Sequence, residues 1–443
     1  MVASAARDDG WDRPGVFAPV HDHRHDHPTG SARAALSYPT FRRMWRASFA
    51  STVGTWMQNV ALPAYIYERT GKAAVVGLLV FAQLGPLLLL SIPAGVIADR
   101  FDRRRWLVLM QVVQLVFSAA LVPLAAIEAP VWSLILVALG VGIGNALNAP
   151  AWGAMLPLLV RREDLAGSVA MNSAALNGSR VIGPILVALL TQVGVTTAEV
   201  FAVNAATYLF VIAALLRTEL PPPILVTPER GWRQLTAGHR LARANPAVNM
   251  ILLALTSFSF VSLVYIGLFP AVADGNFGID EDSPLYQWLY AVWGLGACLG
   301  ALAIGTVFTR HDKRTLIRVG FGAFGVCLAV FALVREPIGA FLTAFPLGFA
   351  YFGTTTSMNT VMQSSLADNE RGRVFALWFM AFGGTVPLGN LAFGPLIDAI
   401  GARWVLLGGA AWALWLAKWC DVAGAERRAA VRAASTVAPV AGD

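Results

Sequence analysis

The chain has 443 residues, of which 57% are hydrophobic and 13% charged, with a formal net charge of +7 and a mean hydropathy of +0.62. Soluble domains carry about 25% charged residues, so this composition excludes a water-soluble globular protein and predicts an integral membrane protein. Cys298, Cys327 and Cys420 are scattered without a Cys-x-x-Cys spacing, which argues against a disulfide framework or a metal site. No cofactor is predicted.

Residues 1–41 are polar and rich in charge, Pro and Gly, and they contain no apolar core that could act as a cleavable signal peptide. We therefore expect a disordered tail. Within it, the run 21–27 alternates His with Asp and Arg. Such a run could hold a divalent metal weakly, but a solvated tail is its more common role.

Long apolar segments separated by short polar loops follow, and each is long enough to cross about 30 Å of hydrocarbon as a helix. Lipid offers no partner for a free backbone amide, and the segments are too long for the alternation of a β-barrel, so we expect helices rather than strands. Twelve spans are predicted at 44–68, 74–98, 106–127, 131–159, 168–192, 197–216, 247–273, 286–309, 314–334, 337–366, 374–397 and 402–420. The expected fold is an all-α membrane protein with twelve transmembrane helices in two six-helix, pseudo-symmetric bundles, at 42–216 and 247–420.

Basic residues in short loops mark the cytoplasmic side of a membrane protein. With the N-terminus inside, the only bases in outside loops are Arg69, Lys72, Arg335 and Arg403, and the outside loop 274–283 carries acids and no base. We therefore expect both termini in the cytoplasm. The net charge then reflects topology, and no nucleic-acid partner is predicted.

Two segments outside the bundles complete the predicted layout, a linker at 217–246 and a cytoplasmic tail at 421–443. The linker begins with three prolines and continues into a stretch in which Trp and Leu are interspersed with Arg at helical spacing. This pattern is typical of a basic amphipathic helix at the inner membrane surface.

The two halves repeat each other in sequence. The stretches 95–104 and 305–314 share a glycine, an Arg, an Asp and a basic pair at the same internal spacing. Asn148 and Asn359 lie 211 residues apart, and two Gly-Pro pairs share that offset. A duplicated membrane protein is typical of a transporter that rocks one half against the other around a central site.

The first repeated stretch predicts a conformational latch. Asp99 would end the second helix close to the start of the eleventh, whose free amides and positive dipole end attract a carboxylate. A salt-bridged latch at a mobile interface can set which conformation dominates. The predicted latch residues are Gly95, Asp99, Arg100, Arg103, Arg104, Glu163, Arg310, Arg371 and Arg373. The alternative is that the arginines are topology signals alone, and Thr309 replaces the Asp in the second half.

Polar residues at helical spacing within the apolar spans predict a substrate cavity, because a side facing lipid should carry none. The predicted cavity residues are Thr55, Gln58, Asn59, Gln83, Asn145, Asn148, Asn177, Arg180, Tyr265, Thr356, Asn359 and Gln363. The alternative is that such amides join helices by hydrogen bonds worth about 1 kcal/mol or less. Gly183 and Pro184 predict a kink in the fifth helix.

Arg180 is the one ionised group predicted well inside a span. Burial of a guanidinium costs at least a few kcal/mol unless water or an acid meets it, so function is the default hypothesis. Arg180 could bind an anionic or polar group of a substrate, or respond to a proton-dependent partner. The alternative is a structural pairing with backbone carbonyls.

The hinge motif at 95–104, the Gly183-Pro184 pair and the motif Arg371-Gly372-Arg373-Val374 resemble the major facilitator superfamily. The likeness covers about 40–420, and the specific resemblance is to the branch that includes bacterial siderophore exporters of the enterobactin type and macrolide efflux pumps. It implies a monomer in the bacterial plasma membrane that exports a small amphipathic compound by alternating access, in exchange for H⁺. Its partners would be the lipid bilayer, the substrate and the proton, with Asp99 locking the cytoplasmic face.

Other function classes fit less well. No Gly-x4-Gly-Lys-Ser/Thr phosphate loop occurs, which argues against an ATP-driven pump. The spans also contain no pair of catalytic residues of the kind that an intramembrane enzyme would need. An importer or lysolipid transporter of the same fold, or a transport-inactive receptor or channel, stays open. The candidate protonation sites, Glu68, Asp274 and Asp398, all fall at predicted outer helix ends.

Overall fold

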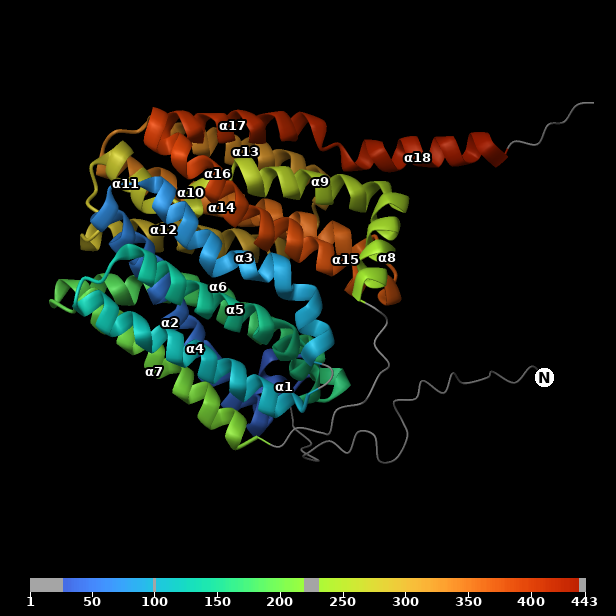
Figure 1. The fold of residues 1–443 in the computed structure, drawn as a ribbon. Helices are drawn as coiled ribbons and strands as arrows, with labels where there is room; N and C mark the ends of the chain where they lie inside the picture. The colour runs from blue at the N-terminus through green and yellow to red at the C-terminus, as the bar shows by residue number, and fades with distance from the viewer. Residues whose placement is uncertain (1–26, 99–100, 219–230, 438–443) are drawn as a thin grey trace, which may run out of the picture.

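The computed structural model describes residues 27–98, 101–218 and 231–437. Every regular element within these ranges is helical. Figure 1 shows two lobes side by side, the first half of the chain in blue to green and the second in yellow to red. Most of the His-rich run, 21–26, lies outside the described residues.

The first lobe contains six long helices that overlap the six predicted spans. They are α2 (Pro39–Thr70), α3 (Ala73–Ala98), α4 (Arg103–Ala126), α5 (Val131–Met155), α6 (Leu165–Gln192) and α7 (Thr197–Leu216). Two short 3₁₀ turns, η1 (Leu156–Leu158) and η2 (Arg162–Asp164), connect α5 to α6.

The second lobe repeats this layout with two interruptions. Its elements are α9 (Pro246–Val261), α10 (Val264–Gly267), α11 (Phe269–Phe277), α12 (Pro284–Gly305), α13 (Lys313–Leu333), α14 (Pro337–Ser364), α15 (Asp368–Phe379), η3 (Met380–Gly384), α16 (Thr385–Ile400) and α17 (Ala402–Trp419). In this lobe the seventh crossing is α9 to α11 and the eleventh is α15 to α16.

The prediction of one continuous helix over 247–273 is wrong in this respect, because the seventh crossing breaks into three pieces. At the first break, Ser262 donates its hydroxyl to the carbonyl of Gly409 (2.8 Å). At the second break, Pro270 stands in the first turn of α11. Proline is tolerated there because the N–H that it lacks would have no partner within the helix, whereas inside a continuous helix it would remove a hydrogen bond. The eleventh crossing is likewise widened by the π-turn η3, which ends in Gly383-Gly384.

Among the described residues, ten helical stretches are long and apolar enough to cross a membrane by themselves. The remaining two crossings are α2, which carries many Ser, Thr and amide residues, and the broken seventh crossing, whose longest piece has 16 residues. The fold is therefore all-α, with twelve crossings in two bundles of six.

The lobes meet through two helix pairs that obey the internal repeat. The second helix of the first lobe, α3, packs against the fifth helix of the second lobe, α16. The second helix of the second lobe, α12, packs in the same way against the fifth helix of the first, α6. The two pairs are equivalent under the pseudo-symmetry of the halves, as rocking about a central site requires.

Helices outside the crossings gather at one end of the molecule. There, α1 (Ala32–Ser37), α8 (Gly231–Ala244) and α18 (Val422–Val437) lie at the same end of the molecule as α15, and we call this end the terminal face (Figure 1). The other end, which includes α11, is the opposite face. The predicted linker helix is present as α8, which meets α9 at 112°.

The prediction of disorder through residue 41 is wrong for its last part, because α1 is helical and is held to the start of α6. The buried carboxylate of Asp164 accepts hydrogen bonds from Gly30 N–H (2.9 Å) and from the Tyr38 hydroxyl (2.7 Å). Burial, reinforced by the bond to Asp164, raises the pKa of Tyr38 to about 12. Sequence patterns missed this contact because its partners are more than 120 residues apart.

Candidate functional site

The crossing of the lobes brings backbones into direct contact at small residues. A Cβ atom at Gly77 of α3 would lie 2.3 Å from the carbonyl oxygen of Asn390 in α16. A Cβ atom at Gly294 of α12 would lie 2.9 Å from the carbonyl oxygen of Arg180 in α6. Glycine at both places therefore lets the two lobes approach closely around the middle of the molecule.

Hydrogen bonds join the lobes at the opposite face. Asp398, near the end of α16, accepts from the backbone N–H groups of Ala73 (2.7 Å) and Ala74 (2.9 Å). These are the first residues of α3, where free amides and the positive end of the helix dipole favour a carboxylate. Close by, the Tyr67 hydroxyl of α2 donates to Asp274 of α11 (3.0 Å). Two links therefore join the lobes at the opposite face.

The predicted latch falls at the terminal face. Asp99 and Arg100 lie outside the described residues, and Gly95, Arg371 and Arg373 fall where only helix backbone is described. The latch therefore stays a prediction.

The described latch candidates make contacts within their own lobes or at the surface. Arg104 of α4 donates to the carbonyl of Leu216 at the end of α7. Glu163 lies 3.7 Å from Arg161 in the same turn. Arg103 begins α4, and Arg310 is exposed in the loop before α13. The structure does not bring these residues together across the lobes.

Gln58 does not line an open cavity, because its side chain is only 2% exposed. Its carbonyl oxygen accepts from Asn204 Nδ2 of α7 (2.6 Å) and from Ser118 Oγ of α4 (3.2 Å). The three side chains form a buried polar cluster that ties α2, α4 and α7 together. This is the alternative that the sequence left open for intramembrane amides.

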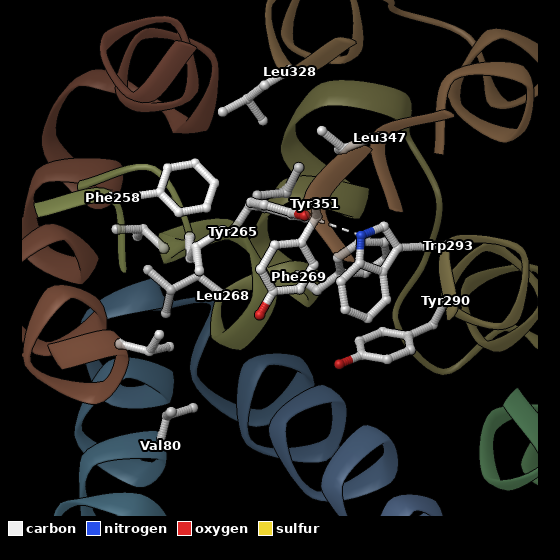
Figure 2. Close-up of a cluster of buried hydrophobic side chains, with 14 of the residues drawn as sticks. Val80, Phe258, Tyr265, Leu268, Phe269, Tyr290, Trp293, Leu328, Leu347 and Tyr351 are labelled. Carbon is white, nitrogen blue, oxygen red and sulfur yellow. Dashed lines mark hydrogen bonds between the residues drawn. The ribbon is translucent and has the colours of Figure 1, made fainter. Parts of the chain in front are cut away.

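Tyr265, another predicted cavity residue, is 1% exposed and lies inside the core of the second lobe. Trp293 Nε1 donates to its hydroxyl (3.0 Å), as Figure 2 shows, and the Phe269 ring packs beside it. Interleaved aromatic rings of α10, α11, α12 and α14 fill this region. In this structure, Tyr265 is therefore a packing residue of the second lobe.

The other predicted cavity residues keep some exposure. The polar stripes of α5 and α14 include Asn145, which is exposed, and Asn148 and Asn359, which are half-buried. Gln111 of α4 donates to Asn148 (3.5 Å), and Gln363 donates to Asn359 along α14. Thr55, Asn59, Gln83, Asn177 and Thr356 are half-buried as well.

Arg180 lies where α6 passes α12, between the lobes. Its guanidinium carbon lies 4.5 Å from the ring centre of Phe352 in α14 and 5.2 Å from that of Trp56 in α2. The cation therefore makes a cation–π contact with one ring from each lobe. Its Nε is buried without a hydrogen-bond partner, and within the described part of the chain no carboxylate pairs with it.

Two tyrosines complete the surroundings of Arg180. Tyr351 of α14 packs against Phe352, the ring that Arg180 contacts (ring centres 4.5 Å apart), and Tyr290 of α12 is near enough to interact with the charge of Arg180. Both rings belong to the aromatic cluster of the second lobe, and Figure 2 shows their hydroxyl groups on the side that faces the blue helices of the first lobe. The arrangement offers a cation and two phenol groups within aromatic walls.

Sequence patterns pointed to Arg180 but missed the four aromatic residues around it, Trp56, Tyr290, Tyr351 and Phe352. One signal was available, since Phe352 lies four residues before Thr356 and seven before Asn359, on the same helical face. Gly183 has a packing role, because a Cβ atom there would lie 2.6 Å from the Trp56 side chain. The kink at Pro184 stays a prediction within α6.

Comparison with known proteins supports one family. The family model described as transmembrane secretion effector matches residues 30–431. Macrolide efflux protein A of Streptococcus pyogenes is 26% identical over 394 residues, 83% of this chain and 92% of that protein. Enterobactin exporter EntS of Escherichia coli is 29% identical over 347 residues, 77% of this chain and 81% of that protein.

Solved structures show the same fold. A bacterial homologue of the human lysosomal transporter Spinster matches with a TM-score of 0.66 at 15% identity, over 88% of this chain and 97% of that one. At this identity the likeness concerns the fold alone.

Proposed function

Since the chain belongs to the transmembrane secretion effector family of the major facilitator superfamily, a family of membrane transporters, we propose that it exports a small amphipathic compound by alternating access. The observation that carries this proposal is the position of Arg180, whose guanidinium from the first lobe makes a cation–π contact with Phe352 of the second. Rocking of the lobes changes the position of Arg180 relative to Phe352, so a site formed by both lobes has a different geometry in each conformation. Transport, rather than static binding, uses such a site.

The proposed orientation places the terminal face in the cytoplasm, as the basic loops suggest. The links from Asp398 to α3 and from Tyr67 to Asp274 then close the outer face. The polar stripes of α5 and α14, with their accessible Asn145 and half-buried Asn359, would meet a compound arriving from the cytoplasm. In this proposal the structure represents the inward-facing state.

Rocking to the outward-facing state would break the Asp398 link and close the terminal face. The predicted latch from Asp99 to the start of α15 would then form. The two acids would act reciprocally at the two ends of the pair formed by the second and eleventh crossings. Asp398 caps the first turn of α3, and Asp99 would cap the first turn of α15. A difference of a few kcal/mol between such contacts is enough to set the dominant state.

We propose H⁺ as the coupling ion, in exchange for the exported compound, and a monomer in the bacterial plasma membrane as the working unit. Collapse of the pH gradient in proteoliposomes should then stop uphill transport while leaving downhill exchange. Uphill transport that continues without a pH gradient would remove the proton from this scheme.

Direction and substrate are tested together by comparing the metabolites inside and outside cells with and without the chain. Export predicts a compound that accumulates in cells lacking the chain and is depleted from their medium. The opposite distribution would make the chain an importer, and no difference in any compound would favour a receptor.

A carrier is distinguished from a channel by locking the lobes together. In a chain whose three cysteines are replaced by Ser, Ala74→Cys with Asp398→Cys places one thiol on α3 and one on α16, where the native contact is 2.9 Å. Oxidation should abolish saturable flux, and reduction should restore it. Each single variant, treated alike, is the control. Flux that persists after cross-linking would exclude alternating access.

A further inference from the structure

The proposed function leaves the chemistry of the compound open, and the surroundings of Arg180 narrow it. We propose that the exported compound carries an anionic group attached to an aromatic ring, which binds to Arg180, Tyr290 and Tyr351 between the lobes. This inference rests on the proposed function, because it assigns the substrate class of the same site.

The first argument is charge. Arg180 is a cation inside the membrane-spanning region, and its described neighbours include phenols and a thiol but no acid. Its Nε is buried without a partner. An unpaired charge in such a place is costly, and it is kept where water, an ion or a substrate meets it. The complementary ligand is therefore an anion.

The second argument is the geometry of the guanidinium. Phe352 and Trp56 lie 4.5 Å and 5.2 Å from its central carbon, one ring from each lobe. A cation–π contact does not satisfy the N–H donors of the guanidinium, and its Nε has no hydrogen-bond partner. A planar carboxylate accepts two such parallel bonds, whereas a hydroxyl or an amine cannot.

The third argument is the pair of phenols. Within the described chain, the hydroxyls of Tyr290 and Tyr351 make no hydrogen bond, unlike that of Tyr265, which accepts from Trp293. Both are positioned on the first-lobe side of the aromatic cluster (Figure 2). Two donors beside a cation suit an oxygen-rich anion, and the surrounding rings suit an aromatic scaffold by stacking or edge contact.

A matched set of probes tests this assignment on the full chain in lipid nanodiscs. The probes are 2-naphthoate, its uncharged amide, and decalin carboxylate, which keeps the charge and loses the aromatic ring. Binding is measured through quenching of tryptophan fluorescence and through the shift in thermal unfolding. The acid should bind at least about tenfold more tightly than the amide, as expected for a charged hydrogen bond, and more tightly than the decalin acid. Equal binding of the acid and the amide would overturn the proposal.

Variants separate recognition from folding. Arg180→Gln should abolish the preference for the acid, and Arg180→Lys should keep only part of it, because an ammonium lacks the planar fork. Tyr290→Phe and Tyr351→Phe remove only hydroxyls, and each should weaken acid binding severalfold. Arg335→Gln, an exposed base in a loop, is the matched control. If the Arg180 variants retain the full preference, the site is elsewhere.

Failure of this inference differs from failure of the proposed function. If cross-linking stops a saturable export but naphthoate shows no preference over its amide, the carrier stands and the substrate class is wrong. If naphthoate binds through Arg180 but no flux of any compound is found, the site stands and the transport function is wrong.

Discussion

At the scale of single residues, Gln58 and Arg180 are both polar groups in membrane-spanning helices, and their partners distinguish their roles. Gln58 has its acceptor oxygen filled by Asn204 and Ser118 within one lobe. Arg180 has rings from both lobes and an Nε without a partner. A satisfied group stabilises its lobe, whereas an unsatisfied group at a moving boundary is available to a ligand.

Gln58→Leu should lower the thermal stability of the protein without changing the KM for the transported compound. Loss of the acceptor leaves Asn204 and Ser118 buried with only the long contact between them (3.4 Å), which costs about 1–2 kcal/mol. Thermal unfolding in detergent and initial transport rates measure the two effects. Gln83→Leu, on the half-buried side of α3, is the comparison. A raised KM at unchanged stability would return Gln58 to the cavity.

Tyr38 and Asp164 give a prediction on pH at the same scale. Because burial raises the pKa of Tyr38 from 10.0 to about 12, the neutral phenol is favoured in the folded chain. The stability contributed by this group is fully present below pH 10 and is lost as the pH rises through about 12.

Hydrogen exchange of α1 should therefore rise steeply above pH 10, once the intrinsic effect of hydroxide is divided out. The Tyr38→Phe variant lacks the hydrogen bond to Asp164, so the exchange rate of its α1 amides should be higher already below pH 10. It also has no phenol proton to lose, so its exchange rate should lack the extra rise. An extra rise of the same size in the Phe variant would assign the effect to another group.

At the scale of elements, α3 and α16 behave as a pair whose two ends are guarded separately. Asp398 holds the first turn of α3 at the opposite face. Gly77 permits the close crossing of the pair. The hinge motif predicted a latch role for Asp99, whereas the sequence suggested Asp398 only as a protonation site. Asp398 caps a helix of the other lobe that lies 325 residues away, and such a contact leaves no local sequence pattern.

Asp398→Asn should favour opening of the opposite face. The amide loses the negative charge at the helix N-terminus and can accept fewer bonds, a loss of about 1 kcal/mol or roughly a fivefold shift in the equilibrium. Labelling of Ala271→Cys, a position of α11 that is buried in this structure, by a membrane-impermeant maleimide in a Cys-free background measures the fraction of chains with an open face. Asp282→Asn, an exposed loop acid, is the control. Equal labelling of the two variants would show that Asp398 is not a latch.

Asp99→Asn should impair transport while leaving membrane insertion and abundance intact. The carboxylate is expected to stabilise the state in which the terminal face is closed, so its loss would slow each cycle. Initial export rates normalised to the amount of protein in the membrane provide the measurement. Asp102→Asn, which alters the cap of α4 instead, is the matched comparison. Export at the normal rate by the Asp99 variant would eliminate the predicted latch.

At the scale of the whole molecule, the sequence was sufficient for the helical class, the twofold repeat and the order of the crossings, because lipid forces apolar segments of this length into helices. It did not show the breaks in the seventh crossing, since Ser262 bonds to a carbonyl 147 residues away. It likewise pointed to Arg180 as a lone charge. The rings around that charge come from α2, α12 and α14, and no local periodicity records which helices meet.

The contacts of Arg180 with Trp56 and Phe352 have a consequence for inhibition. Trp56 and Arg180 belong to one lobe and Phe352 to the other, so the gap between the rings closes only when the lobes come together. An acid that satisfies Arg180 but carries a bulky, rigid substituent beyond its ring would act as a wedge. Such a molecule would occupy the chain without being carried, and resistance to it would arise at Phe352 before it arose at Arg180.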